Sequence, residues 1–313
     1  MTTIEWTRSD DGTEGKTWNP TTGCDRISPG CDRCYALTMA KRLKGMGSAK
    51  YQNDGDPRTS GPGFGITGHP DTLGEPLRWK KPRRVFVNSM SDLFHARVTT
   101  SLITDVWKIM AATPQHTYQI LTKRASRLAP VLAKVHAELG LTEPLPNVWL
   151  GVSVENQKYA DLRIPGLLAA PAAVRFLSCE PLLGPVDLRL PVDHTTHERD
   201  YTDGTPWPQC LDCSTEDGPT VDWTVPDGPR INWVIVGGES GPGARPMNPG
   251  WAASLIQQCR DASVAPFVKQ LGSVWARDYT IAGKTVTGHG DTKGGDPAYW
   301  PAHLRVREYP TPA

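Results

Sequence analysis

Short apolar runs recur along the chain and indicate buried strands. They are rich in β-branched and aromatic residues and lie at residues 85–87, 118–121, 148–152, 174–177, 233–236 and, more weakly, 266–268. Near-continuous hydrophobicity over so few residues is typical of strands covered on both faces, as in a parallel sheet. We therefore expect a parallel sheet made from these runs, preceded by a first strand at about residues 16–20.

Segments with the apolar spacing of amphipathic helices lie between several of these runs. They cover residues 101–112, 124–139 and 249–262, and a further helix is expected at residues 34–44. Strands that alternate with helices form βα units with right-handed crossovers. The pattern therefore predicts an α/β fold, a TIM-like full or partial (β/α) barrel, with a doubly wound open sheet as the alternative.

One long stretch, at about residues 191–230, breaks this alternation. It is rich in His, Asp, Thr, Pro and Gly and has no apolar periodicity. We expect an irregular insertion between two strands, within a single domain that spans residues 1–313. Two pairs inside it, His194 with His197 and Cys210 with Cys213, have the spacing of a four-ligand zinc site. A second cluster and solvent-exposed side chains without metal are the alternatives.

Composition limits the class of protein. Hydrophobic residues make up 38% and charged residues 21% of the chain, which suits a globular core, and the net charge of +1 excludes a surface that is basic throughout. No apolar run approaches the roughly 20 residues that span a bilayer, and the first residues lack the apolar core of a signal peptide. We expect a cytoplasmic protein without membrane contact, in which cysteines are metal ligands, reactive groups or core residues rather than disulfide partners.

Polar residues follow one predicted strand after another. They lie at residues 88–92, 122–124, 153–156, 178–181, 237–241 and 269–270. The carboxyl ends of parallel strands meet at one edge of the sheet, where active sites are built. The sequence thus predicts a site at this edge, although strand ends are often polar where no site exists.

Three cysteines form the strongest local motif of the chain. Cys24, Cys31 and Cys34 follow a C-x6-C-x2-C pattern, with a Pro29-Gly30 turn between the first two. Thiolates bind soft metals and iron–sulfur clusters. Three ligands would leave one iron of a [4Fe–4S] cluster free for a small molecule. A zinc site with a distant fourth ligand and three unrelated thiols are the alternatives.

A basic segment indicates contact with nucleic acid. Trp79, Lys80, Lys81, Arg83 and Arg84 combine positive charge with one aromatic ring, a composition that can grip phosphates and stack on a base. We expect Lys123 and Arg124, which follow the next strand, to lie nearby. A solvated turn that leads into a strand is the alternative.

Five long motifs resemble a known family. The chain is similar, at residues 17–24, 82–95, 121–124, 176–182 and 235–246, to a phage- and mobile-element-associated family of uncharacterised function. That family is placed among radical S-adenosylmethionine (SAM)-like barrels, with distant similarity to spore photoproduct lyase. The resemblance extends over nearly the whole chain except about residues 193–229. It implies a barrel of the radical SAM type.

The resemblance also implies an activity. A [4Fe–4S] cluster and SAM would generate a 5′-deoxyadenosyl radical that acts on a nucleic-acid base or nucleotide, in phage DNA modification or repair. An electron donor and a companion protein encoded alongside are the implied partners. The cysteine spacing departs from the usual C-x3-C-x2-C of radical SAM enzymes, so an iron–sulfur protein that does not use SAM stays open, as does a non-enzymatic, metal-stabilised nucleic-acid-binding module.

Cofactor contacts follow from the same resemblance by position along the barrel. Ser89, Ser91 and Asp92, after the second strand, would receive the methionine amine of SAM. Ser153 and Glu155, after the fourth, would hold the ribose hydroxyls. Carboxylates suit both tasks because they accept charge-assisted hydrogen bonds.

Two further strand ends complete the expected site. Gly237, Gly238 and Glu239 would let the backbone approach the cofactor closely. Cys179 and Glu180 are the candidate catalytic residues. The Cys179 thiol would donate a hydrogen atom to a substrate radical, as the resemblance to the photoproduct lyase suggests, or it is simply a small buried residue.

Overall fold

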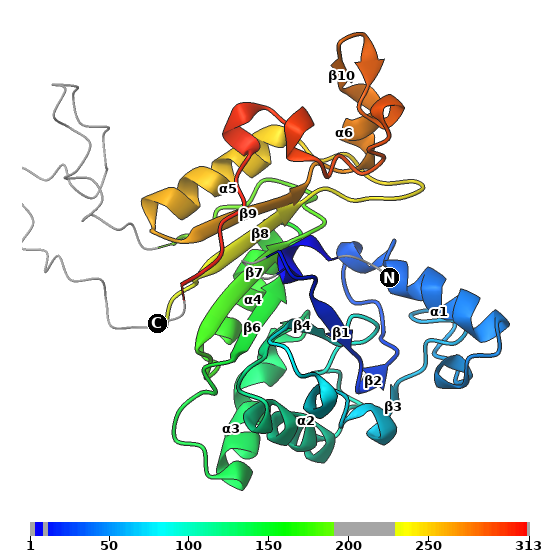
Figure 1. Cartoon of the computed structure of the whole chain (residues 1–313), viewed down its shortest axis with the longest axis vertical. Helices are drawn as coiled ribbons and strands as arrows, with labels where there is room; N and C mark the ends of the chain where they lie inside the picture. The colour runs from blue at the N-terminus through cyan, green and yellow to red at the C-terminus, as the bar shows by residue number, and fades with distance from the viewer. Residues whose placement is uncertain (1–3, 9–11, 191–228, 312–313) are drawn as a thin grey trace, which may run out of the picture.

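A curled, seven-stranded parallel sheet organises the protein. The computed structural model describes residues 4–8, 12–190 and 229–311. The strands are β1 (Lys16–Trp18), β4 (Arg84–Val87), β5 (Thr117–Thr122), β6 (Val148–Ser153), β7 (Val174–Cys179), β8 (Trp233–Gly237) and β9 (Ala265–Gln270). They pair side by side in chain order, and every pair is parallel, so that the sheet forms a half-barrel (Figure 1).

All the predicted strands are confirmed, and so is an α/β fold with a partial barrel. The strand order follows the chain without the reversal that defines a doubly wound sheet. Apolar runs located these strands well because helices cover one face of the sheet and other side chains fill the concave face, which leaves little of either face polar.

Helices lie between or after the strands of the sheet. They are α1 (Tyr35–Gly45), α2 (Thr100–Ala112), α3 (Leu128–Leu139), α4 (Gln157–Leu168), α5 (Pro249–Asp261) and α6 (Ser273–Asp278). Local signals fix their ends: the Thr99 hydroxyl accepts from the Leu102 amide to start α2, and Gly140, at φ +64°, ends α3. Three of the four predicted helices match closely, whereas residues 125–127 of the predicted 124–139 helix form a separate 3-10 turn.

Helix α4 was not predicted, and its sequence shows why. Pro165 lies inside it, and its buried residues are Ala160, Arg163 and Leu167, so no stripe of large apolar side chains marks the helix. Asn156 caps it by accepting from the Tyr159 amide. Packing against the sheet and the neighbouring turn, rather than sequence periodicity, therefore defines this helix.

The remaining elements are short. Two small antiparallel pairs join β2 (Thr21–Thr22) to β3 (Thr67–Gly68) and β10 (Thr280–Ile281) to β11 (Lys284–Thr285). The 3-10 turns are η1 (Glu5–Thr7), η2 (Pro29–Cys31), η3 (Ala49–Tyr51), η4 (Pro70–Thr72), η5 (Pro76–Arg78), η6 (Ala125–Arg127), η8 (Thr287–His289), η9 (Pro297–Tyr299) and η10 (Ala302–Leu304).

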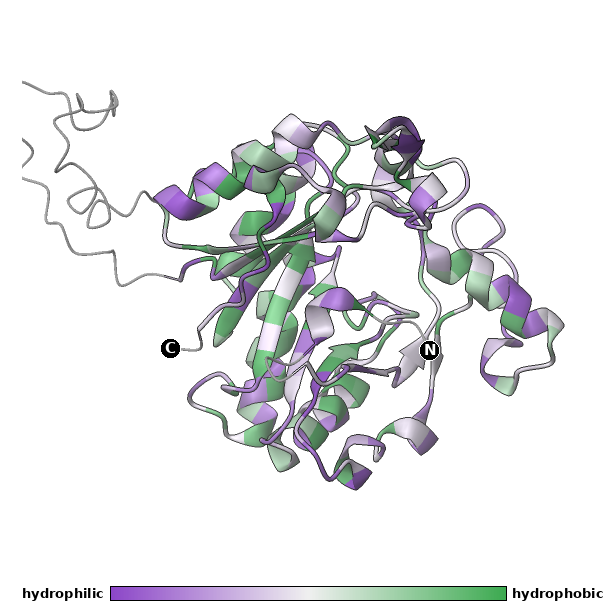
Figure 2. Cartoon of the chain, turned by 45° about the horizontal axis from the view of Figure 1, so that its top comes forward, coloured by the Kyte–Doolittle hydropathy of each residue, from purple (hydrophilic) through white to green (hydrophobic). Residues whose placement is uncertain are grey.

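Two apolar clusters lie on opposite faces of the sheet, and Figure 2 shows the hydrophobic colouring of the central strands. The larger cluster fills the space between the sheet and the helices. The smaller one is aromatic and includes Trp6, Trp149, Phe176, Trp233 and Phe267. Trp149 and Trp233 stand at or next to the first residue of their strands, so this cluster occupies the amino-terminal part of the sheet. The carboxyl ends of the strands are left to polar side chains.

The predicted zinc ligands His194, His197, Cys210 and Cys213 lie outside the described residues. The chain is described again from residue 229 and enters β8 at Trp233. Among the helices that the structure describes, none is both long and apolar enough to cross a membrane.

Candidate functional site

The three predicted metal ligands lie on one loop at the carboxyl end of the sheet. Cys24 follows β2, Cys31 ends the η2 turn, and Cys34 immediately precedes α1. Two backbone hydrogen bonds tighten the loop, from the Cys31 amide to the Ser28 carbonyl at 2.8 Å and from the Cys34 amide to the Cys31 carbonyl at 3.2 Å. All three thiols are half-buried. The sequence therefore folds this motif into one compact segment.

The thiols influence one another electrostatically. Burial raises the pKa of Cys24 to about 12 and also raises the pKa of Cys34, and the charge of Cys31 adds to both effects. Two cations act in the opposite direction, since Arg124 lowers the pKa of Cys24 and Lys123 lowers that of Cys34. Thiolates must lose their protons to bind metal, so nearby cations favour that form.

The donor set fits an iron–sulfur cluster in its chemistry. Three thiols from one loop are the ligand type of such a cluster, and the nearby guanidinium and ammonium groups would offset part of its negative charge. Within the described residues, no three or more His, Cys, Asp and Glu side chains are arranged to hold a single metal ion. What links these cysteines is their common loop and their electrostatic effect on each other.

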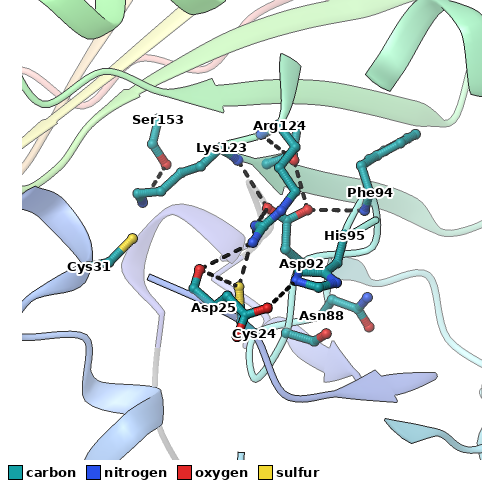
Figure 3. Close-up of polar contacts among 12 residues, drawn as sticks. Cys24, Asp25, Cys31, Asn88, Asp92, Phe94, His95, Lys123, Arg124 and Ser153 are labelled. Atoms are coloured by element: carbon teal, nitrogen blue, oxygen red, sulfur yellow. Dashed lines mark hydrogen bonds and ion pairs between the residues drawn. The ribbon is translucent and has the colours of Figure 1, made fainter. Parts of the chain in front are cut away.

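Arg124 contacts Cys24 directly (Figure 3). Its Nη1 atom lies 3.4 Å from Cys24 Sγ and 2.8 Å from Asp92 Oδ2, and its Nη2 donates to the Asp25 carbonyl at 3.1 Å. Only 11% of the side chain is exposed. Arg124 is thus used inside the site, and the prediction that it contacts nucleic acid finds no support in its position.

A second ion-pair network holds the residue next to Cys24. Asp25 Oδ2 lies 2.8 Å from His95 Nε2 and 3.0 Å from Arg97 Nη2, while Oδ1 accepts from the hydroxyls of Thr59 and Ser60. Burial alone would raise the pKa of this carboxyl, but these hydrogen bonds outweigh it and hold the pKa well below its usual range. The carboxylate therefore joins the cysteine loop to residues 59–60.

Glu155, which follows β6, contacts the middle of the cysteine loop at Ser28 and Gly30. This fully buried carboxylate accepts from Ser28 Oγ at 2.6 Å and from Arg163 Nη1 at 2.7 Å, and Lys123 Nζ lies 3.6 Å away. Burial alone would raise its pKa, but the two cations and the hydroxyl hold the pKa below the ordinary value of 4.5. A Cβ on Gly30 would come within 2.4 Å of Glu155 Oε1, so the loop can rest on the carboxylate only with glycine there.

Glu239 connects the cysteine loop to the far side of the sheet. Its carboxylate accepts from the backbone amide of Arg245 at 2.8 Å and from Nε of the same residue at 3.0 Å, and Arg33 Nη1 donates to it at 3.2 Å. Arg245 Nη2 in turn donates to the Pro29 carbonyl at 2.9 Å. β8 therefore fixes the loop segment between Cys24 and Cys31.

The two glycines before Glu239 serve close packing within the chain. A Cβ on Gly238 would come within 2.4 Å of the Leu271 carbonyl oxygen, and one on Gly237 would lie 3.2 Å from the Glu180 carboxyl carbon. The structure thus supplies a reason for glycine at position 238 that needs no bound molecule, whereas a small shift of the Glu180 side chain would relieve the contact at position 237.

The residues expected to bind SAM do converge at one edge, but each already has partners within the chain. Ser91 Oγ donates to the Gly23 carbonyl at 2.7 Å, Ser89 Oγ donates to Asn19 Oδ1 at 3.2 Å, and Ser153 Oγ accepts from Lys123 Nζ at 3.0 Å. Asp92, Glu155 and Glu239 have the contacts given above. The sequence predicted that these residues lie at one edge of the sheet. It did not predict their partners, chiefly Ser28, Arg163 and Arg245, because no local pattern encodes such contacts.

Cys179 and Glu180 have different surroundings. Cys179 is fully buried in the helix-facing cluster, the same cluster as Leu177, and burial raises the pKa of its thiol well above the usual range. This location favours the small-buried-residue interpretation over hydrogen-atom donation. Glu180 is only partly buried, and its Oε1 lies 2.7 Å from Lys269 Nζ, an ion pair that sequence reasoning did not assign to the site.

The basic segment lies at the other end of the sheet, and the expected closeness to Lys123 and Arg124 is therefore wrong. Residues 79–84 precede or begin β4, whereas Lys123 and Arg124 follow the end of β5, which runs parallel to it. Trp79 packs against the core with its ring 5.6 Å from the His116 ring. A cleft of about 540 Å³ beside it is lined by Lys16, Trp79 and Arg83, among others.

Within this segment, Lys80 and Lys81 are exposed. The other two cations have partners: Arg83 donates to the Glu14 carbonyl at 3.1 Å, and the Arg84 guanidinium stacks 4.1 Å from the Tyr309 ring. Of the predicted nucleic-acid contacts, the two lysines are thus the ones that face solvent.

Comparison with known proteins places the chain in a family. A family described as "Protein of unknown function (DUF5131)" matches residues 1–295, so the chain belongs to it. None of the curated proteins and none of the solved structures compared with the chain matches it.

Proposed function

We propose that this member of the DUF5131 family is a radical SAM enzyme that holds a [4Fe–4S] cluster through Cys24, Cys31 and Cys34. The observation that carries the proposal is the cysteine loop itself: three half-buried thiols on one short segment, at the carboxyl edge of a parallel half-barrel. Active sites of parallel α/β folds are built at this edge. Lys123 and Arg124 beside the thiols add the positive charge that a thiolate centre needs.

When bound, the cluster and SAM would supply one-electron cleavage of a C–S bond and so a 5′-deoxyadenosyl radical. The residues of the chain would fix the ligand loop. Arg124 orients Cys24, Glu155 holds Ser28 next to Cys31, and Arg245 holds the Pro29 carbonyl. Charged groups that follow β5, β6 and β8 therefore act on one loop, which would hold the three sulfurs in place.

An iron–sulfur protein that does not use SAM is the second candidate. It is favoured by the contacts of Asp92, whose two oxygens accept from the Thr122 hydroxyl, from the amides of Phe94 and Lys123 and from Arg124. A carboxylate has about four acceptor positions, so Asp92 has none left for a methionine amine. SAM would then have to bind through other groups of this edge.

For the substrate we propose a nucleic-acid base or nucleotide, in phage DNA modification or repair. The support is the resemblance of the motifs to the radical SAM-like family and the exposure of Lys80 and Lys81. The proposal also includes a cytoplasmic location and an electron donor, with a companion protein encoded alongside as a further partner.

One experiment tests the cluster and separates the two candidates. The protein, reconstituted anaerobically with iron and sulfide, should bind about four irons per chain. Cys24→Ala, Cys31→Ala and Cys34→Ala should each lose the iron, whereas Cys259→Ala, which removes a core cysteine outside the loop, should keep it. Unchanged iron content in the three loop variants would rule out the proposed ligands.

Reduced, iron-loaded protein should then convert SAM to 5′-deoxyadenosine, measured by liquid chromatography and mass spectrometry. Product formation supports the radical SAM enzyme. A fully loaded and reduced protein that leaves SAM intact would exclude it and leave the second candidate.

A further inference from the structure

Arg124 is held in a fixed orientation next to one cysteine sulfur. Its guanidinium spans Cys24 Sγ, the Asp92 carboxylate and the Asp25 carbonyl, at 3.4, 2.8 and 3.1 Å. The side chain is nine-tenths covered. Three acceptors on two sides leave this planar group little freedom to turn away from the sulfur.

Asp92 fixes that orientation from the opposite side. Its Oδ1 accepts from the Thr122 hydroxyl at 2.7 Å and the Phe94 amide at 3.0 Å, and its Oδ2 accepts from the Lys123 amide at 3.1 Å. Backbone groups from two neighbouring strand ends therefore hold the carboxylate still. Arg124 in turn stands between this negative charge and the Cys24 sulfur (Figure 3).

We propose that Arg124 is a positioning residue that sets the reduction potential of the thiolate centre, by donating a hydrogen bond to Cys24 Sγ and by neutralising Asp92 beside it. This inference rests on the proposed function, because it concerns a cluster bound at Cys24. It assigns Arg124 a role that does not involve contact with nucleic acid.

The direction of the effect follows from charge. Reduction adds negative charge to a cluster, and a hydrogen bond to a ligand sulfur or a nearby cation stabilises the added charge and raises the potential. Removing the guanidinium removes both contributions. It also leaves the Asp92 carboxylate uncompensated near the sulfur, which lowers the potential further.

Arg97 offers a matched control. Its Nη2 atom lies 3.0 Å from Asp25 Oδ2, so it is also an arginine paired with a carboxylate of this region. Its side chain is 53% exposed, and its guanidinium is directed at Asp25 rather than at a sulfur. Replacing Arg97 therefore removes the same formal charge without removing a hydrogen bond to a thiolate.

The test measures the midpoint potential of the reconstituted full-length protein by anaerobic redox titration, together with iron content and the spectrum of the reduced cluster. We expect Arg124→Gln to shift the potential to more negative values and Arg124→Lys to shift it less, because the amine keeps the charge but not the planar set of donors. Arg97→Gln should shift the potential less than Arg124→Gln, because it leaves the hydrogen bond to Cys24 Sγ in place. The double variant Asp92→Asn with Arg124→Gln should recover part of the shift, since both charges are gone.

The outcomes separate this inference from the proposed function. Wild-type protein that binds no cluster overturns both. A loaded wild type together with Arg124→Gln and Arg124→Lys variants that keep its potential overturns the role of Arg124 alone. If both Arg124 variants fold but lose their iron while Arg97→Gln keeps it, Arg124 is a structural support only, and the tuning role is wrong.

Discussion

At the scale of single residues, Gly30 of the cysteine loop lies against the buried carboxylate of Glu155, which follows β6. The loop passes so close to the buried carboxylate that a Cβ at position 30 would lie 2.4 Å from Oε1. The side chain that would have to yield is itself fixed by Ser28 and Arg163. An added methyl group therefore has to displace the loop.

Gly30→Ala should destabilise the protein by about 1–3 kcal/mol, the usual cost of forcing a methyl group into a packed site, and should lower iron retention. Gly45→Ala is the matched control, because a Cβ there meets nothing within 4 Å and the residue lies in α1. It should change the stability by less than about 1 kcal/mol. Urea unfolding and iron analysis measure both effects, and equal behaviour of the two variants would contradict the close contact.

The charge of Glu155 gives the stability a defined pH dependence. A carboxyl group whose folded pKa lies below its ordinary value of 4.5 stabilises the protein above that pH, and the contribution is lost as the pH falls through the lower folded pKa. Glu155→Gln should therefore be less stable than the wild type at neutral pH by about 3–5 kcal/mol, since it leaves Arg163 buried without its counter-charge.

The difference in stability between the wild type and Glu155→Gln should narrow as the pH falls below 4.5 and through the lower folded pKa of Glu155. Glu138→Gln is a suitable control, because that side chain is 54% exposed. Denaturant unfolding at a series of pH values measures the difference. A gap that stays constant from neutral to strongly acid pH would show that folding does not lower the pKa of Glu155.

At the scale of elements, two groups of cations lie at opposite ends of the neighbouring strands β4 and β5. Lys80 and Lys81 precede β4, whereas Lys123 and Arg124 follow β5 and act on the cysteine loop. Only the first pair is both exposed and distant from the thiols. Any binding of nucleic acid through these lysines should therefore be independent of the cysteine site.

Lys80→Ala combined with Lys81→Ala should weaken DNA binding at every sequence and reduce the salt dependence of log K by about two units, because each phosphate contact contributes close to one. Iron content should be unchanged. A double variant of the exposed Lys134 and Lys158 to Ala, on α3 and α4, removes the same charge elsewhere. Binding curves at several salt concentrations that do not distinguish the two double variants would refute the lysine contact.

The strands could be predicted because burial on both faces leaves a signature in consecutive residues, and the site edge followed from parallel topology. The partners of the site residues could not be predicted. Arg124 reaches Cys24 across 100 residues, Ser28 reaches Glu155 across 127, and Arg33 reaches Glu239 across 206. Such contacts arise only when the sheet has curled, and no local pattern encodes them.

At the scale of the whole molecule, early and late segments of the chain meet on the concave face of the sheet. Trp6 packs against Trp233 with ring centroids 6.2 Å apart, and Tyr309 lies 5.5 Å from the same tryptophan. The Tyr309 hydroxyl also donates to the Glu5 carbonyl at 3.3 Å. Since this aromatic cluster fills the amino-terminal part of the half-barrel, the framework is stabilised at one end while polar chemistry is concentrated at the other.

The link between Asp25 and residues 59–60 would let the turn at residues 56–61 report on the metal binding proposed at the cysteine loop. Asp25 adjoins Cys24, and the amides of Thr59, Ser60 and Gly61 all donate to the Asp56 carbonyl in a tight turn. A metal that immobilises Cys24 should also slow the opening of the turn at residues 56–61. The amide protons of this turn should then exchange with deuterium more slowly. Peptic fragments that cover this turn contain no cysteine. The deuterium uptake measured from their mass would nevertheless report whether a metal is bound at the cysteine loop.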